Sequence, residues 1–271
     1  MFFIHKCIQH LNPHGELIFI VPRDFLKATS SIKLNQYIYD NGTITDIIDL
    51  GDEKIFKDAC PNCVIFRFEK DNFERKTNIT KNFSVINGQM FFTNNKYKIK
   101  FSDLFFVKVG AVSGADKYFI HENGNKEFVC SETCKTGDTR KMFYNTDAEE
   151  LLPYKDILIK RKIKNFTEKD WYMWGRKYYE SKENRIYVNS KTRNKKPFFF
   201  HNCKAYDGSV LSIFPKFKAT QKICKEIAKD LNNVDWEELG FICDGRFLFS
   251  QKSLENCLLP DVFYKYMSYI E

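Results

Sequence analysis

The sequence predicts an α/β fold over residues 1–70 and a mixed α+β fold over the rest of its 271 residues. Apolar residues recur at helical spacing in some segments and form short continuous or alternating runs in others. Turn-forming residues separate one segment from the next. The predicted order over residues 1–70 is helix, strand, helix, strand, strand.

The first helix and strand have clear start and stop signals. A helix is predicted because Phe3, Ile4, Cys7, Ile8 and Leu11 recur at helical spacing. The turn Asn12-Pro13-His14-Gly15 ends this helix. Glu16 to Val21 is a nearly continuous apolar run, the pattern of a strand covered on both faces, and Pro22 closes it.

The second helix starts near Ser30 or Ser31, either of which can cap it. We expect Asn41-Gly42 to end it with left-handed residues. Two strands then follow without a helix between them, at residues 43–50 and 63–69. The second of these alternates, with Val64, Phe66 and Phe68 on one face.

Two sequence blocks in this region resemble a known family. "LNPHGELIFIVPRDFL" (residues 11–26) and "IFKDACPNCVIFRFEK" (residues 55–70) resemble the amino-group DNA methyltransferases that modify adenine at N6, in the branch whose recognition domain follows the catalytic domain. "VKVGAVSGADKYFI" (residues 107–120) is a looser match to the segment that opens the recognition domain. The resemblance implies an incomplete Rossmann-like methyltransferase sheet, with its last strands in residues 1–75, followed by a target-recognition domain in residues 76–271.

The motifs that carry cofactor binding and catalysis in the resembled family are absent from this sequence. The family binds S-adenosylmethionine through a glycine-rich turn, whereas none of the 12 glycines here lies two positions from another. Catalysis in the family uses an Asn/Asp-Pro-Pro-Tyr/Phe tetrapeptide, whereas the 7 prolines include no adjacent pair. The resemblance therefore implies S-adenosylmethionine for the complete enzyme, no catalytic residue in this chain and no binding of the cofactor by this chain alone.

Phe56 is the residue of the first region to which the resemblance assigns a role. A DNA base methyltransferase takes its target adenine out of the base stack, and an aromatic wall stabilises the flipped base. In the resembled family the aromatic residue ahead of the last strand forms one side of that pocket, and Phe56 occupies the matching place. Lys57 beside it is expected to contact a phosphate. The alternative is an ordinary core phenylalanine among many.

The basic charge of the chain is concentrated in one segment. Residues 151–200 hold 14 Lys and Arg against 5 Asp and Glu, which leaves 29 of the chain's 43 basic and 30 of its 35 acidic residues elsewhere. Such a patch can neutralise phosphates, and Trp171, Trp174, Tyr178 and Tyr179 are interleaved with it. We predict DNA contacts by Lys160, Arg161, Lys162, Lys164, Arg176, Lys177, Arg185, Lys191, Arg193, Lys195 and Lys196. The alternative is a solvated lysine-rich face.

Base recognition within this patch is expected from arginine and asparagine. Arginine bonds the major-groove edge of guanine with two donors, and asparagine does the same for adenine. Arg176, Arg193 and Asn194 are the candidates. An arginine in a basic patch can equally contact a backbone phosphate. Gly110 and Gly114 form either a close-approach loop against DNA or a turn between strands.

The remaining patterns predict short elements around the basic segment. Strands are expected near residues 83–92, 107–120, 198–200 and 209–214, a helix at 220–231, and a docked apolar end at 258–270. No run of apolar residues approaches the ~18 of a membrane span, and a cytoplasmic protein is expected. The 9 cysteines are expected to be reduced.

The cysteine spacing admits a metal site as the less favoured alternative. Cys60 with Cys63, and Cys130 with Cys134, have spacings that occur in structural zinc sites. We expect no metal site, because Cys63 leads into an apolar strand and the Cys130 pair has no neighbouring histidine.

These observations lead to one main hypothesis and two others. The main one is the carboxy-terminal portion of an adenine-specific DNA methyltransferase of a restriction-modification system, inactive alone, with double-stranded DNA as its partner. The second is a stand-alone DNA-binding specificity subunit, completed in trans by a separate chain that carries the amino-terminal catalytic half. The third is an RNA-binding module, which would bind single-stranded RNA more tightly than duplex DNA at matched salt.

Overall fold

The computed structural model describes residues 2–51, 56, 62–78, 81–94, 97–243 and 245–270. It divides into two compact units. Unit 1 comprises residues 1–103, 234–248 and 252–268, and unit 2 comprises residues 104–233, 249–251 and 269–271. Both are mixtures of helices and small β-sheets. The boundary at residue 75 stays a prediction, because compactness alone groups residues 76–103 with those before them.

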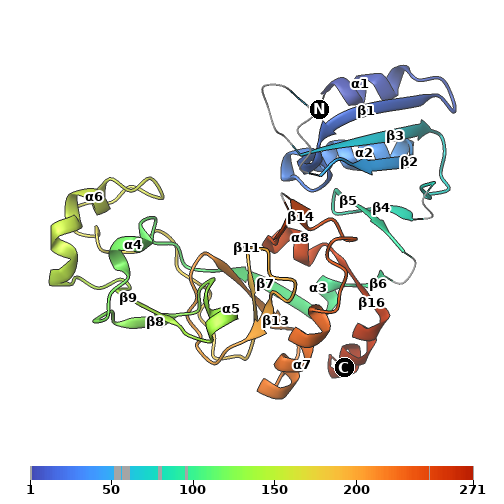
Figure 1. Ribbon diagram of the computed structural model, residues 1–271. Coiled ribbons are helices and arrows are strands. Elements are labelled where there is room, and N and C mark those ends of the chain that lie inside the picture. Colours follow the sequence, from blue (N-terminus) through green and yellow to red (C-terminus); the bar gives the residue numbers. More distant parts are fainter. Residues whose placement is uncertain are drawn as a thin grey trace. The chain divides into compact units, whose positions relative to one another are not determined.

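The first elements of unit 1 follow the predicted order (Figure 1). They are α1 (Phe2–His10), β1 (Glu16–Pro22), α2 (Ile32–Asn41), β2 (Gly42–Asp49) and β3 (Cys63–Lys70). Two 3-10 turns, η1 (Arg23–Leu26) and η2 (Thr29–Ser31), connect β1 to α2. β3 lies between β1 and β2 and runs antiparallel to both, so β1 and β2 are parallel to each other.

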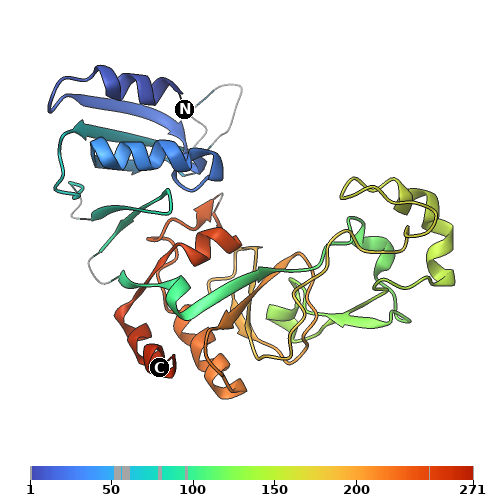
Figure 2. The ribbon, with the colours of Figure 1, turned by 180° about the vertical axis from the view of Figure 1, so that it is seen from behind.

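Both helices of this region pack on the same face of the three-stranded sheet, and Figure 2 shows that face. The alternation predicted for β3 is confirmed, because Val64, Phe66 and Phe68 are buried while the residues between them are half-buried. The buried cluster that joins helices to sheet contains Ile4 and Ile8 of α1, Leu34 and Ile38 of α2, and the three inward residues of β3.

The opposite face of the same sheet is not covered by any described element, which corrects the prediction for β1. The exposed fraction is 66% for Ile18 and 58% for Ile48, and Ile20 is also exposed. Along β1 exposed and half-buried residues alternate. The continuous apolar run therefore gave the strand correctly but gave the wrong burial, since only one face of β1 meets a core.

Gly42 ends α2 for a different reason than predicted. Its φ of 160° is extended rather than left-handed, and Asn41 keeps the helix going to its last residue. A Cβ atom on Gly42 would lie 2.1 Å from the carbonyl oxygen of Glu69 in β3. Glycine is required here because β2 begins in close contact with β3. Ser31 occupies the cap position of α2 but makes no side-chain cap bond.

The rest of unit 1 consists of short elements. β4 (Asn82–Ile86) and β5 (Gln89–Thr93) form a hairpin. Its two-residue turn is Asn87-Gly88, with φ of 48° and 76°, the conformation that favours this residue pair. β6 (Tyr97–Lys100) pairs with β16 (Leu258–Pro260), and β14 (Ile242–Cys243) pairs with β15 (Arg246–Leu248). The strands predicted near residues 83–92 are confirmed.

Unit 2 is built on a four-stranded antiparallel sheet. Its strands, in spatial order, are β12 (Phe198–Phe200), β10 (Ile186–Asn189), β13 (Val210–Pro215) and β7 (Phe105–Val109). Every residue of β10 and β13 is buried. The smaller elements are β8 (Lys126–Phe128), β9 (Arg140–Met142), β11 (Lys191–Thr192), α4 (Asp116–Phe119), α5 (Thr133–Thr136), η3 (Glu149–Tyr154) and α6 (Lys155–Ile159).

The strand predicted over residues 107–120 is correct only at its start. β7 ends at Val109, and α4 follows within the predicted range. The Ser113 hydroxyl donates to the Asp116 carboxylate and accepts from the backbone N–H of Ala115 at 3.0 Å. Local side-chain bonds of this type turn the backbone away from an extended strand.

Three predictions for the carboxy-terminal third are confirmed. The strands at 198–200 and 209–214 are β12 and β13. The helix is α7 (Gln221–Leu231), where Thr220 caps the backbone N–H of Ile223 at 3.3 Å. The apolar end docks as η4 (Asp261–Tyr269), with Phe263 and Tyr266 buried, and is preceded by α8 (Gln251–Glu255). Among the described residues no helix is long and apolar enough to cross a membrane.

Candidate nucleic-acid interface

The predicted basic segment lies in unit 2, and most of its charged side chains are exposed. Exposure leaves an ammonium or guanidinium group available to a phosphate oxygen. The exposed members of the predicted set are Lys160, Lys162, Lys164, Arg176, Lys177, Lys191, Arg193, Lys195 and Lys196.

Arg161 is an interior residue. Its guanidinium donates to the carbonyl oxygens of Leu158 at 2.7 Å and Met173 at 2.9 Å, and also to those of Ser113 and Trp171. Its charge lies 3.8 Å from the centre of the Phe166 ring. Burial lowers the pKa of Arg161 to about 10, although the nearby Asp170 carboxylate opposes this. The five-donor group ties together three chain segments, so we leave it out of the proposed DNA contacts.

Arg185 is likewise used by the fold. It is fully buried and donates from Nε to the Glu183 carbonyl at 3.1 Å and from Nη1 to the Lys204 carbonyl at 3.4 Å. Its guanidinium lies 4.5 Å from the centre of the Phe214 ring. A guanidinium so enclosed has no route to a phosphate or a base edge. Charge counting in a sequence does not separate such interior arginines from exposed ones.

The exposed lysines after α6 lie on a loop that packs against Gly114 and Gly175. A Cβ atom on Gly114 would lie 3.0 Å from the Ile163 side chain, and one on Gly175 would lie 2.4 Å from it. Ile163 therefore holds residues 160–164 against the segment that leads to Arg176. A Cβ atom on Gly110 would lie 1.8 Å from the Asp207 carbonyl. Both predicted glycines pack against the chain itself, which favours the turn alternative over a loop pressed on DNA.

The candidates for base reading differ in how free their side chains are. Arg176 is exposed, although its Nε donates to the Gly110 carbonyl at 3.1 Å. Asn194 holds a turn: its amide oxygen accepts from the Lys196 N–H at 3.0 Å, and its nitrogen contacts the Cys134 sulfur at 3.4 Å. Arg193 is exposed beside it. The geometry therefore leaves arginine, rather than Asn194, available at this loop.

The loop at residues 191–196 meets lysines that the sequence reasoning missed. Lys196, Phe198, Phe200, Lys225, Lys229 and Asn232 line a pocket of about 350 Å³. Lys225 and Lys229 are one helical turn apart on α7, on the face opposite its buried stripe. The spacing of these two lysines would have been the signal for them. Counting charge in one window of 50 residues excluded α7 from the prediction.

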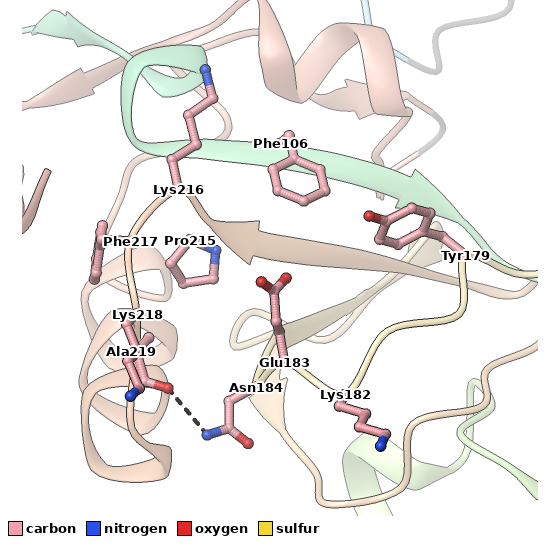
Figure 3. A pocket seen from close by; sticks show the side chains of 10 residues that line it. All are labelled: Phe106, Tyr179, Lys182, Glu183, Asn184, Pro215, Lys216, Phe217, Lys218 and Ala219. Carbon is pink, nitrogen blue, oxygen red and sulfur yellow. Dashed lines mark hydrogen bonds between the residues drawn. The ribbon is translucent and has the colours of Figure 1, made fainter.

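A larger basic pocket, of about 820 Å³, lies beside the end of β13 (Figure 3). Its floor is held by Asn184, whose amide donates to the Ala219 carbonyl at 3.1 Å and accepts from the Lys204 ammonium at 3.0 Å. Burial lowers the pKa of Lys204, and Arg185 adds to that effect. The lining residues are Phe106, Tyr179, Lys182, Glu183, Asn184, Pro215, Lys216, Phe217, Lys218 and Ala219.

This pocket combines aromatic surface with cationic side chains. Tyr179 is 44% exposed and packs edge-on against Phe106, with ring centres 6.1 Å apart. Lys182, Lys216 and Lys218 are exposed around the opening, against one carboxylate. Aromatic faces accept nucleobases and ammonium groups accept phosphates, so the lining suits a nucleotide-like group. Two of these lysines follow β13 and lie outside the predicted basic segment.

Three of the four aromatic residues that are interleaved with the basic segment are core residues. Trp171, Trp174 and Tyr178 are buried in one cluster of unit 2. The Trp174 ring stacks on Phe128 with centres 4.9 Å apart, and its N–H donates to the Phe143 carbonyl at 2.9 Å. Interleaved aromatic and basic residues here indicate side chains that alternate between core and solvent. Tyr179 is the exception, being exposed.

Phe56 is 42% exposed, but its surroundings are not described. Lys57 and residues 52–55 lie outside the described residues, as does Cys60. The base-stacking role of Phe56 and the phosphate contact of Lys57 therefore stay predictions.

In the described part of the chain, the cysteines of the candidate zinc site lie among other groups of the protein. Burial raises the pKa of Cys130 and that of Cys134. The described residues contain no cluster of three His, Cys, Asp or Glu side chains that could hold a metal ion, either around Cys130 or elsewhere. Cys63 begins β3 as a buried residue, as expected from the apolar run that follows it.

The carboxyl ends of β1 and β2 lie at the same edge of their sheet, because the two strands are parallel. This is the edge at which open α/β sheets bind ligands. An ion pair of 3.0 Å between Arg23 and Asp49 spans it. The pocket there, of about 650 Å³, is lined by Arg23, Asp49, Gly51, Lys81, Asn94, Asp235, Glu237 and Glu238.

The first region of the chain matches known proteins. Residues 1–56 match the Eco57I restriction-modification methylase family. This part of the chain is similar to restriction-modification methylases. Over 68 residues it is 35% identical to the type II methyltransferase M.HincII of Haemophilus influenzae, a stretch that makes up 25% of this chain and 14% of that protein. Over 72 residues it is 28% identical to the type II restriction enzyme and methyltransferase RM.Eco57I of Escherichia coli, or 27% of this chain and 7% of the other.

The fold of the chain also resembles a solved restriction-modification enzyme. Over 93% of this chain and 40% of the other, it superposes on the type IIL enzyme MmeI, solved in complex with DNA, with a TM-score of 0.55 and 10% sequence identity. At that identity the likeness concerns the fold alone. Each of these sequence matches covers about a quarter of this chain and a small part of the curated relative.

Proposed function

We propose that this chain is the carboxy-terminal portion of an adenine-specific DNA methyltransferase of a restriction-modification system. Unit 1 would supply the last strands of a Rossmann-like catalytic sheet, and unit 2 the target-recognition domain that grips DNA. The observation that carries the proposal is the match of residues 1–56 to methylases, joined in one chain to a unit whose surface gathers exposed lysines and arginines.

The proposed DNA contacts fall into two sets in unit 2. The first is the exposed predicted set, from Lys160 to Lys196 without Arg161 and Arg185. The second is the pocket of Figure 3, where Lys216 and Lys218 flank an aromatic lining. Phosphate contacts made by such side chains are independent of sequence. Arg176 and Arg193 are proposed to read bases, because an exposed guanidinium can bond guanine with two donors.

The family relationship implies S-adenosylmethionine for the complete enzyme, but the residues described here do not fit that cofactor. The pocket at the carboxyl edge of the sheet has only charged and polar side chains and one glycine in its lining. The described lining offers no apolar wall for an adenine ring, and the sequence has no closely spaced glycines for the cofactor-binding turn of the resembled family. We therefore derive no catalytic step in this chain and propose that Phe56 contributes one side of the target-base pocket.

The proposal is tested by separating binding from catalysis. The purified 271-residue chain should bind duplex DNA and should transfer no methyl group to it from S-adenosylmethionine. The Lys216→Ala/Lys218→Ala variant should bind more weakly, whereas Lys98→Ala, an exposed lysine of unit 1, should bind as the parent does. Methyl transfer by the chain alone, or equal binding by all three proteins, would overturn the proposal.

A further inference from the structure

The pocket of Figure 3 has one acidic side chain in its lining, Glu183, and the backbone of this residue is fixed by the fold. Its carbonyl oxygen accepts from the Arg185 guanidinium, at 3.1 Å from Nε and 3.0 Å from Nη2, and from the Lys204 ammonium at 3.2 Å. Its N–H donates to the Ser181 hydroxyl at 3.1 Å. These backbone bonds hold the residue in place without the use of its carboxylate.

The Glu183 carboxylate itself points into the pocket. Figure 3 shows it directed towards the side on which the rings of Phe106, Pro215 and Tyr179 lie. Within the described part of the chain its one hydrogen-bond partner is the Ser181 hydroxyl at 3.4 Å, which is long for a hydroxyl donor. A carboxylate accepts hydrogen bonds through both of its oxygens and donates none. The pocket therefore presents a pair of acceptors beside an aromatic wall.

Tyr179 supplies the stacking surface of this wall. Its ring packs edge-on against Phe106 and Phe214, with ring centres 6.1 and 5.3 Å away, and the residue is still 44% exposed. The two phenylalanine rings stack on each other and so support the tyrosine ring. An exposed aromatic ring stacks with a nucleobase of any kind. The exposed Lys216 and Lys218 at the opening are the groups available to the phosphate of the same nucleotide.

Guanine is the base whose edge matches a pair of acceptors. Its Watson–Crick edge carries the N1–H and the N2 amino group side by side, so one carboxylate accepts from both. Adenine and cytosine place an acceptor nitrogen next to their amino group, and thymine places carbonyl oxygens on both sides of its N–H. An acceptor of these bases would face a carboxylate oxygen, which disfavours them. The guanine donors are occupied by cytosine in a duplex, so this pocket can bind only an unpaired guanine.

We propose that the pocket of Figure 3 binds a guanine nucleotide whose base is unpaired, and that Glu183 is the residue that selects guanine. The base stacks on Tyr179 and donates to the Glu183 carboxylate, and the phosphate meets Lys216 or Lys218. The pocket volume of about 820 Å³ lies within the range of ~300–1,000 Å³ that small-molecule sites occupy. The same chemistry fits a free guanine nucleotide and a guanine displaced from a DNA strand. For the DNA source the inference rests on the proposed function, because it gives one pocket of the proposed DNA-binding surface a base preference.

The first test measures the affinity of the 271-residue chain for free GMP, AMP, CMP and TMP by ligand-detected NMR titration. GMP should bind most tightly. Glu183→Gln should weaken GMP binding by about tenfold or more, the effect of one hydrogen bond to a charged group. It should not weaken AMP binding, because an amide offers one acceptor and one donor to the adenine edge. Glu180→Gln is the matched control, since it removes the same charge from an exposed glutamate outside the pocket lining, and both affinities should stay unchanged.

The second test distinguishes DNA from a free nucleotide as the source of the guanine. Three duplexes of equal length contain a single bulged guanine, a single bulged adenine or no bulge, and fluorescence anisotropy gives their affinities. If DNA is the source, the chain should prefer the bulged guanine, and Glu183→Gln should abolish that preference. If the three duplexes bind alike while GMP is preferred among the nucleotides, the ligand of the pocket is a free guanine nucleotide.

Three results would overturn the inference. They are the absence of a guanine preference in both tests, a preference that Glu183→Gln leaves intact, and a preference that Glu180→Gln removes to the same extent. The backbone bonds of Glu183 remain in its glutamine variant, so the fold should survive, and thermal unfolding of each variant verifies this. Absence of binding to every duplex, the fully paired one included, would contradict the proposed function instead. The two failures are therefore distinguishable.

Discussion

β1 and β13 have nearly the same sequence character and opposite environments. β1 reads ELIFIVP and β13 reads VLSIFP. Every residue of β13 is buried between two neighbouring strands and the core of unit 2, whereas among the described residues β1 has one neighbouring strand and one uncovered face. A strand made almost entirely of apolar residues predicts that other elements cover both of its faces. In unit 2 the chain itself provides them, whereas no described element of unit 1 covers the outward face of β1.

The largest expected effect is a difference in stability between matched isoleucines of the two strands. Ile213→Ala removes a fully buried side chain of β13 and should lower the free energy of unfolding of unit 2 by about 2–5 kcal/mol. Ile18→Ala removes an exposed side chain of β1 and should change it by less than about 0.5 kcal/mol. Urea denaturation of the two variants measures both. Equal costs would break the comparison.

A second comparison sets interior against exposed cations within one loop. Arg161→Met should destabilise unit 2 by at least about 2 kcal/mol, because carbonyl groups left without donors cost roughly 1–3 kcal/mol each. Lys162→Met, the exposed neighbour, should leave stability unchanged and weaken duplex binding. Denaturation curves and fluorescence anisotropy give the two readouts. If Arg161→Met unfolded no more easily than Lys162→Met, the interior role of Arg161 would be refuted.

The Figure 3 pocket should contribute measurably to the salt dependence of DNA binding. Each phosphate contact adds roughly 0.9 to the slope of log affinity against log salt. Lys216→Ala/Lys218→Ala should therefore reduce the magnitude of that slope by about 1.8 if each lysine meets one phosphate. Titrations at four salt concentrations measure this change. An unchanged slope would show that the pocket is not part of the DNA interface.

The smallest expected effect concerns pH and a buried carboxylate of unit 2. Burial raises the pKa of Asp207 above its ordinary value of 3.8, and its Oδ2 atom lies 3.8 Å from the Arg140 guanidinium. The folded state then holds its proton more tightly than the unfolded state, so stability falls as pH rises from 3.8 towards the raised pKa. Asp207→Asn should remove this fall in stability with rising pH. It should also raise the free energy of unfolding at pH 7 by on the order of 1 kcal/mol. Unfolding measured from pH 3 to 7 checks both. A variant less stable than the wild type at pH 7 would contradict this assignment.

The first five elements of unit 1, and some of the later ones, could be predicted from local pattern to within a few residues. Periodicity gave α1, β1, α2, β2 and β3 in order, and it gave α7 to within one residue. Burial was harder to predict, because it depends on what lies across a face. The sequence of β1 contains no sign that its outward isoleucines meet no described element.

The candidate interface was predictable in charge but not in geometry. The basic segment is on unit 2 and mostly exposed, as charge clustering indicated. Arg161 and Arg185 have the same residue type as their exposed neighbours, and only tertiary contacts draw them inside. Lys216 and Lys218 follow a buried strand far along the chain, so no local window could join them to Tyr179 and Lys182.

We propose above all that unit 2 binds duplex DNA through exposed lysine and arginine side chains. The most direct measurement is the affinity of the 271-residue chain for duplex DNA and for single-stranded RNA of equal length, over a series of matched salt concentrations. We predict tighter binding to the duplex at every salt concentration and an affinity that falls linearly on the log–log scale as salt rises. Preference for the RNA, or no binding to the duplex at low salt, would contradict the account.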